Sequence, residues 1–227
     1  MSKNILWCVL LERSVGYHAM QSLLNVAGHN ARKGYARLGM PYTRTDDARN
    51  SAVMAFARMA QNDDDTLVML DCDQLYPPDV VERLVSHNVG VVGALVFRRG
   101  VPYDVCAFRR ADDGNLANVP YEGQAGLQEV TIVGTGAIAI QRWVFSAMDE
   151  AGYTWPYFRL AYTGGQALQP GEDIYFGAAC ELADVPHYVD FDLNCPHLIT
   201  QTVDIETAKL YQGGGQPGKA LREVELC

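Results

Sequence analysis

Runs of apolar residues separated by amphipathic stretches organise the first hundred residues of the chain. Three continuous apolar segments are typical of strands covered on both faces, and they span 5–11, 66–70 and 89–97. Apolar residues at helical spacing predict three intervening helices, over 17–26, from Thr45 onward and after Pro77-Pro78. Alternating strands and helices predict parallel strand pairing with right-handed crossovers, as in nucleotide-binding α/β folds.

The pattern changes after residue 100. The segments 103–110 and 128–140 favour hairpin-forming strands, with Asp113-Gly114 as a turn. A helix is predicted next, over 143–150, and a short aromatic loop follows over 153–158. A second helix over 172–183 and a last strand over 187–191 complete this half. This half therefore predicts a mixed α+β arrangement rather than a continued parallel sheet.

The fold class that follows is α/β, in one domain over residues 1–211. Residues 1–99 form a Rossmann-type nucleotide-binding half with a mixed sheet, which continues without a linker into an α+β half over 100–211. Gly213-Gly214-Gly215 and Pro217-Gly218 mark residues 212–227 as a flexible glycine-rich tail.

Composition narrows the functional classes. Hydrophobic residues make up 48% and charged residues 20% of the 227 residues, which is typical of a soluble globular protein. A net charge of −9 argues against holding nucleic acid on a general basic surface. The six cysteines form no CxxC pair, which argues against a zinc ribbon or a disulfide scaffold. Several lie within apolar runs, as small buried thiols do, so a reducing compartment is expected. The first apolar run is too short to span a bilayer, so a cytoplasmic protein without a membrane span is expected.

Asp71-Cys72-Asp73 stands where the second buried strand ends. Ligands of open α/β sheets bind at the carboxyl ends of strands, and two adjacent carboxylates repel each other unless a cation lies between them. Such a pair suits a hard divalent cation that also binds phosphate oxygens. Asp190 and Asp192 also end a predicted strand and are a rival pair, whereas Asp63-Asp64-Asp65 is interpreted as a solvated turn. A plain acidic loop before a helix is the alternative to a site at Asp71 and Asp73.

Four motifs in this order carry a resemblance to a known family: LVMLDCDQLYPPDVVERL, VGTGAIAIQRWVF, GEDIYFGAACELA and CPHL. Together they resemble metal-dependent glycosyltransferases of the GT-A fold, in particular the family 2-like enzymes of phages and bacteria. The resemblance implies transfer of a sugar, in an inverting reaction, from a nucleotide-diphosphate sugar to a hydroxyl acceptor. UDP-sugar is the default donor, and the acceptor is a glycan, a protein or a modified DNA base. It also implies a divalent metal, Mn²⁺ preferred and Mg²⁺ possible, that stabilises the diphosphate leaving group.

The resemblance also assigns roles to individual residues. Asp73 would bind the metal and the diphosphate, Asp71 the donor ribose or the metal shell, and His197 would complete the metal site. Asp173, ahead of Glu172, would be the catalytic base, although acidic residues are favoured in the first turn of any helix. The remaining donor candidates are Glu12, Arg49, Asn50 and Cys72, and the sugar or acceptor candidates are Gly134, Thr135, Gly136 and Trp155. A glycine bulge and an aromatic core are the structural alternatives for the last group.

Three other functions are compatible with parts of the pattern. A haloacid dehalogenase-type phosphatase uses Asp-x-Asp after a buried strand, and a sugar-phosphate nucleotidyltransferase shares the layout. A non-catalytic module that binds nucleotide or carbohydrate through a metal is the third. The chain also departs from the family: the first strand ends in LLERS, and no acidic residue ends a second strand around 35–40. The nucleobase of the donor and the oligomeric state are not indicated.

Overall fold

The computed structural model describes residues 3–10, 12, 14–160 and 171–199. The strands of the described residues are β1 (Ile5–Leu10), β2 (Ala36–Met40), β3 (Thr66–Asp71), β4 (Val91–Leu95), β5 (Ala107–Arg110), β6 (Leu116–Asn118), β7 (Leu127–Val130), β8 (Ile132–Val133), β9 (Ala137–Gln141) and β10 (His187–Asn194). The helices are α1 (Tyr17–Ala31), α2 (Thr45–Ala57), α3 (Val80–Ser86), α4 (Arg142–Glu150) and α5 (Glu172–Leu182). The predicted tail over 212–227 lies outside the described residues.

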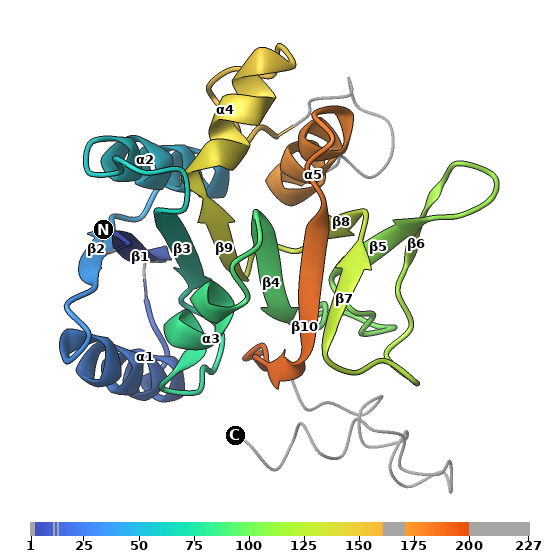
Figure 1. Ribbon diagram of the computed structural model, residues 1–227. Coiled ribbons are helices and arrows are strands. Elements are labelled where there is room, and N and C mark those ends of the chain that lie inside the picture. Colours follow the sequence, from blue (N-terminus) through green and yellow to red (C-terminus); the bar gives the residue numbers. More distant parts are fainter. Residues whose placement is uncertain (1–2, 11, 13, 161–170, 200–227) are drawn as a thin grey trace, which may run out of the picture.

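A seven-stranded sheet in the order β2-β1-β3-β9-β4-β10-β7 forms the centre of the fold (Figure 1). β1 pairs in parallel with β2 and β3, and β10 pairs in parallel with β4. β9 is antiparallel to both of its neighbours, and β7 is antiparallel to β10. A second, three-stranded sheet in the order β6-β5-β8 adjoins it. This arrangement confirms the predicted α/β class with a mixed sheet.

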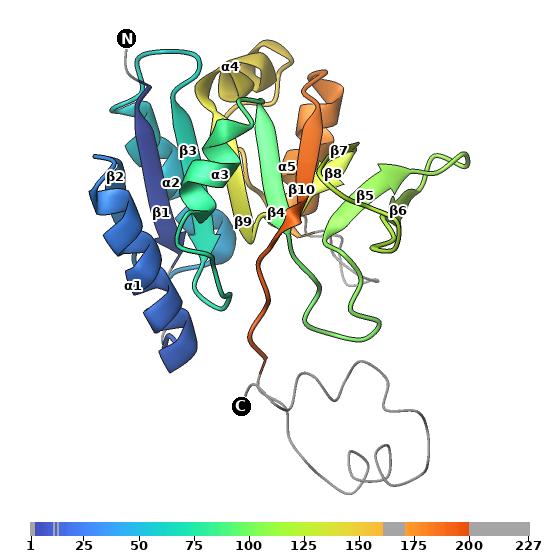
Figure 2. The same ribbon diagram turned by 60° about the horizontal axis from the view of Figure 1, so that its bottom comes forward.

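Alternating side chains of the strands create a core on each face of the large sheet. In β1, Ile5, Trp7 and Val9 pack into one hydrophobic cluster, and Leu6, Cys8 and Leu10 pack into the other. α1 and α3 cover the first cluster, and α2, α4 and α5 cover the second (Figure 2). The continuous apolar strands in the sequence follow from this burial on two faces.

Two of the sequence predictions about strand pairing need correction. β3 and β4 do not pair with each other, because β9 from the second half of the chain lies antiparallel between them. The segment predicted as one strand over 128–140 is divided into β7, β8 and β9, and the Asp113-Gly114 turn joins β5 to β6 instead. The position of β9 and the division of the 128–140 segment both depend on pairing with strands far away in the sequence. Local hydrophobic patterns do not show which distant strands pair.

The other two acidic clusters also differ from expectation. Asp190 lies inside β10 and its carboxylate is 3.0 Å from His87 Nε2 and 3.6 Å from Arg83 Nη2, so it is buried in an ion-paired position. Asp65 is fully buried and accepts hydrogen bonds from the backbone N–H groups of Asn4, Gln61 and Asn62. These contacts make both residues structural, and only the Asp71 pair stands at a strand end.

Candidate active site

The candidate site lies at the edge of the sheet where β3 and β1 end. Asp71 is the last residue of β3, and its backbone N–H donates to the carbonyl of Gly136 at 2.9 Å. The Cys72 thiol, which is buried, accepts a hydrogen bond from the backbone N–H of Glu12 at 3.1 Å. Glu12, Asp71 and the Gly134–Gly136 loop therefore meet at one edge, as the carboxyl-end rule predicts.

Arg49 is the centre of the hydrogen-bond network. It extends from α2 and is only 2% exposed, which is rare for an arginine. Its Nη2 donates to both carboxylate oxygens of Asp71 at 3.0 and 3.2 Å, and its Nε donates to Glu172 at 3.1 Å. Its Nη1 donates to the carbonyl of Thr135 at 3.1 Å. One buried cation thus connects β3, the start of α5 and the loop between β8 and β9.

Asp71 and Asp173 both have raised pKa values. Burial, reinforced by the charges of Asp73 and Glu172 and opposed by Arg49, raises the pKa of Asp71 to about 6. Burial and the neighbouring charge of Glu172 also raise the pKa of Asp173 above its usual range. Among the described residues, no cation lies within ion-pair distance of Asp173, whereas Glu172 is held by Arg49.

Asp73 stands between two cationic or potentially cationic side chains. Its Oδ2 lies 2.7 Å from Arg99 Nη1, and its Oδ1 lies 3.8 Å from His197 Nε2. Arg99 belongs to the turn of the hairpin that is closed by the Phe97–Val105 bridge, and its side chain is 59% exposed. The expected neighbours Asp73 and His197 are thus on the same side of the molecule, and Arg99 is an additional contact.

Gln74 fixes the orientation of His197. The imidazole Nδ1 donates a hydrogen bond to the carbonyl of Phe97, so Nδ1 carries the proton and Nε2 presents its lone pair as an acceptor. Gln74 Nε2 donates to that lone pair at 3.0 Å, and Gln74 Oε1 is buried without a partner. A Cβ at Gly136 would lie 2.0 Å from Gln74 Nε2, so glycine is required there for the amide to fit.

The donor set fits a divalent ion only in part. A carboxylate oxygen of Asp73 and the Nε2 of His197 suit Mn²⁺, which accepts oxygen and imidazole ligands, and a metal at Nε2 would replace the hydrogen bond from Gln74. Among the described residues, however, no three histidine, cysteine or acidic side chains lie close enough together to hold an ion. Asp71, expected as a third ligand, is turned toward Arg49 instead. The residues present fit an ion whose coordination is completed by substrate phosphates and water.

Three of the expected site residues have other surroundings. The Asn50 amide donates to the backbone carbonyl of Phe158 and accepts from its N–H. Trp155 lines a hollow between α2 and α4, away from Asp71. A Cβ at Gly134 would lie 2.7 Å from the Cβ of Cys106, so packing explains this glycine.

The structure adds Arg99 and Gln74, which the sequence analysis did not assign to the site. Arg99 lies in the hairpin that is closed by the bridge between Phe97 and Val105. Gln74 could have been predicted as a site residue, because it directly follows Asp73 in the sequence. For Arg99, the contact depends on how the hairpin folds back over the strand ends, and no local pattern indicates it.

No protein-family model matches the chain, and a search of curated proteins gives no match either. Solved structures are similar at the level of the fold. Protein A197 of STIV has a TM-score of 0.56 and 19% identity, over 87% of this chain and 86% of that one. A glycosyltransferase involved in glycosylation of the major capsid of PBCV-1 has a TM-score of 0.47 and 10% identity, over 87% and 96%. A mutant Drosophila β-1,4-galactosyltransferase 7, in complex with manganese, UDP-Gal and xylobiose, has a TM-score of 0.43 and 14% identity, over 90% and 78%.

These comparisons describe the α/β architecture and assign no activity. Among the described residues, no helix has both the length and the apolar character that crossing a membrane requires.

Proposed function

We propose that the protein is a metal-dependent glycosyltransferase that moves a sugar from a nucleotide-diphosphate donor to a hydroxyl acceptor. The observation that carries the proposal is the convergence of Asp73, His197 and Arg99 at the end of β3. Two ligands for a hard cation and one guanidinium at the same place suit a diphosphate, which needs charge compensation as it leaves. A UDP-sugar is the donor expected first, with the family resemblance as its support.

In this proposal Asp73 and His197 hold the divalent ion, Mn²⁺ in preference to Mg²⁺. When bound, the ion supplies Lewis-acid stabilisation of the departing diphosphate. Arg99 is 59% exposed and reaches Asp73 from a hairpin, so it can turn from that carboxylate to a phosphate oxygen. Glu12 and Asp71 line the side where the ribose of the donor would lie. The Thr135 carbonyl, fixed by Arg49, shapes the wall toward the transferred sugar.

Asp173 is the better candidate for the catalytic base. Its pKa is raised by burial and by Glu172, and a carboxylate with a higher pKa accepts a proton more readily. Glu172 is tied to Arg49 and serves as a positioning residue for the same network. Asp173 would take the proton of the acceptor hydroxyl while that oxygen attacks the anomeric carbon and the carbon–phosphate-oxygen bond breaks.

The phosphatase alternative is less well supported by the geometry. In a haloacid dehalogenase-type reaction the first aspartate is the nucleophile and needs a free carboxylate oxygen. Both oxygens of Asp71 accept hydrogen bonds from Arg49, which makes this carboxylate a poor nucleophile.

A panel of nucleotide sugars, incubated with Mn²⁺ or with EDTA, tests the proposal through release of nucleoside diphosphate. We expect Mn²⁺-dependent release from at least one donor and a decrease of about 100-fold or more in Asp73→Asn. Asp173→Asn should lower kcat by roughly 100-fold or more and leave donor binding intact. Asp64→Asn, the same change on an exposed residue, is the control. Release that is equal in EDTA, or in Asp73→Asn, would contradict the proposal.

A further inference from the structure

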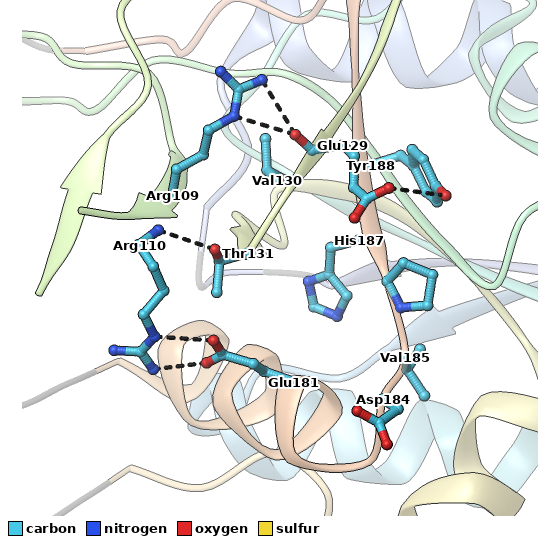
Figure 3. Close-up of a pocket in the computed structure, with 11 residues that line it drawn as sticks. Arg109, Arg110, Glu129, Val130, Thr131, Glu181, Asp184, Val185, His187 and Tyr188 are labelled. Atoms are coloured by element: carbon cyan, nitrogen blue, oxygen red, sulfur yellow. Dashed lines mark hydrogen bonds and ion pairs between the residues drawn. The ribbon is translucent and has the colours of Figure 1, made fainter. Parts of the chain in front are cut away.

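A cavity lies at the end of the sheet opposite to the candidate active site. It has a volume of about 670 Å³ and is lined by residues of β5, β7, α5 and the start of β10 (Figure 3). His187 begins β10 and Asn194 ends it, so the cavity lies at the end of this strand that is opposite to the carboxyl end. Its size is within the range of small-molecule sites.

His187 is the unusual residue of this cavity. It is 1% exposed, and neither ring nitrogen has a hydrogen-bond partner among the described residues. Figure 3 shows the ring facing the space near Thr131 and the Glu181 end of α5, with no contact drawn to it. A buried donor or acceptor without a partner costs free energy, so a group that satisfies both nitrogens would be favoured there. Phe176 stacks on the ring at 5.8 Å and keeps it in place.

The chemistry of the lining selects among ligands. Two arginines and three carboxylates line the cavity, so an anion has no net electrostatic advantage. Arg110 is already paired with Glu181 at 2.7 Å, and Arg109 donates to the backbone carbonyl of Glu129. Within the described part of the chain, no cluster of three metal-ligating side chains is present here either. Carboxylates and guanidinium groups side by side favour a neutral ligand that both donates and accepts hydrogen bonds.

A hydroxyl group both donates and accepts hydrogen bonds, and a neutral imidazole presents one donor and one acceptor that match it. Tyr188, Val185 and Pro186 supply aromatic and aliphatic surface against which the C–H faces of a sugar ring pack. A single water would occupy about 30 Å³ and leave most of the cavity free. Because the ring nitrogens are covered, a ligand reaches them after the small rotamer shifts that are common at binding sites.

We infer that the cavity around His187 is a binding site for a neutral saccharide, separate from the candidate active site. This inference does not depend on the transfer activity. If that activity holds, the site would retain a glycan acceptor or product at a distance from the reacting sugar.

The test is a titration of the full chain, without metal or nucleotide, with methyl hexosides and neutral disaccharides. Binding is followed by ¹H–¹⁵N NMR, and inorganic phosphate is the comparison ligand. We expect at least one saccharide to shift the amides of residues 129–131 and 185–188, and phosphate not to. His187→Phe keeps the stacking on Phe176 and removes both nitrogens, so it should weaken binding about tenfold or more.

Thr131→Val removes a hydroxyl that faces the same space and accepts a hydrogen bond from the backbone N–H of Arg110 at 3.1 Å. This variant should also weaken binding, and it is the second test if His187→Phe does not fold. His18→Phe, on the exposed surface of α1, is the matched control and should bind like the wild type. The inference is overturned if no saccharide of the panel binds, if phosphate alone binds, or if His187→Phe and Thr131→Val both bind as tightly as the wild type. Because neither donor nor metal is present, these results are independent of the test of the transferase activity.

Discussion

Replacement of Arg49 by methionine gives the most informative perturbation of stability. The guanidinium is almost fully buried and makes hydrogen bonds to Asp71, Glu172 and the Thr135 carbonyl. Methionine fills a similar volume but leaves two carboxylates without their counter-charge. Removal of one partner from a buried ionic network costs about 3–5 kcal/mol, and we expect Arg49→Met to lower the free energy of unfolding by that amount.

The measurement is chemical denaturation at pH 7, with Arg142→Met as the matched control. Arg142 pairs with Asp63 at 2.9 Å on the surface, where side-chain exposures of 40% and 78% imply a loss below about 1 kcal/mol. The double variant Arg49→Met/Glu172→Gln should recover part of the loss, because one uncompensated carboxylate is gone. Equal effects of Arg49→Met and Arg142→Met would refute the reasoning, and so would a double variant that is less stable than Arg49→Met alone.

Three further predictions concern single residues. Asp65→Asn should lower the free energy of unfolding by about 2–3 kcal/mol, because Asp65 accepts three backbone hydrogen bonds in its charged form. Although burial acts in the opposite direction, these hydrogen bonds hold the pKa of Asp65 below its usual range. The stabilisation by Asp65 is therefore present above about pH 4 and is lost as the pH falls further. An acid titration of Asp65→Asn should not show this loss of stability. Burial, opposed by Glu181 (itself paired with Arg110), lowers the pKa of His187 to about 4; stability should therefore decrease by up to about 3 kcal/mol as the pH falls from 6.5 to 4. The same decrease in His187→Phe would contradict this. Arg99→Gln should tighten Mn²⁺ binding and weaken nucleoside diphosphate binding by calorimetry, because Arg99 pairs with Asp73 in competition with the metal; a parallel change in both affinities would refute it.

The elements of the first half could be predicted from the sequence because they are local. Buried strands, the Pro77-Pro78 helix start and the Asp71 strand end are each determined by neighbouring residues. The helix predicted over 17–26 extends to Ala31, and a strand at 36–40 carries too few apolar residues to stand out from a loop.

The positions of long-range partners could not be predicted in the same way. β9 enters the sheet between β3 and β4, and it brings the Gly136 carbonyl to Asp71. Arg49 was a candidate for donor binding on the basis of its helix, but its three partners come from segments 22 to 123 residues away. Asn50, its neighbour, faces the Phe158 backbone. One turn of helix thus contains one residue of the site and one of the core, and only tertiary structure distinguishes them.

A cation site shared by Asp73 and His197 is the central feature of the proposed transferase. Isothermal titration calorimetry of UDP, with Mn²⁺ and with EDTA, tests it directly on the wild type, Asp73→Asn and His197→Gln. We predict that Mn²⁺ strengthens UDP binding to the wild type at least tenfold and that either substitution abolishes this gain, because a metal bound by one remaining side chain is held weakly. An equal gain from Mn²⁺ in all three proteins, or none in the wild type, would contradict the assignment of the cation to these two residues.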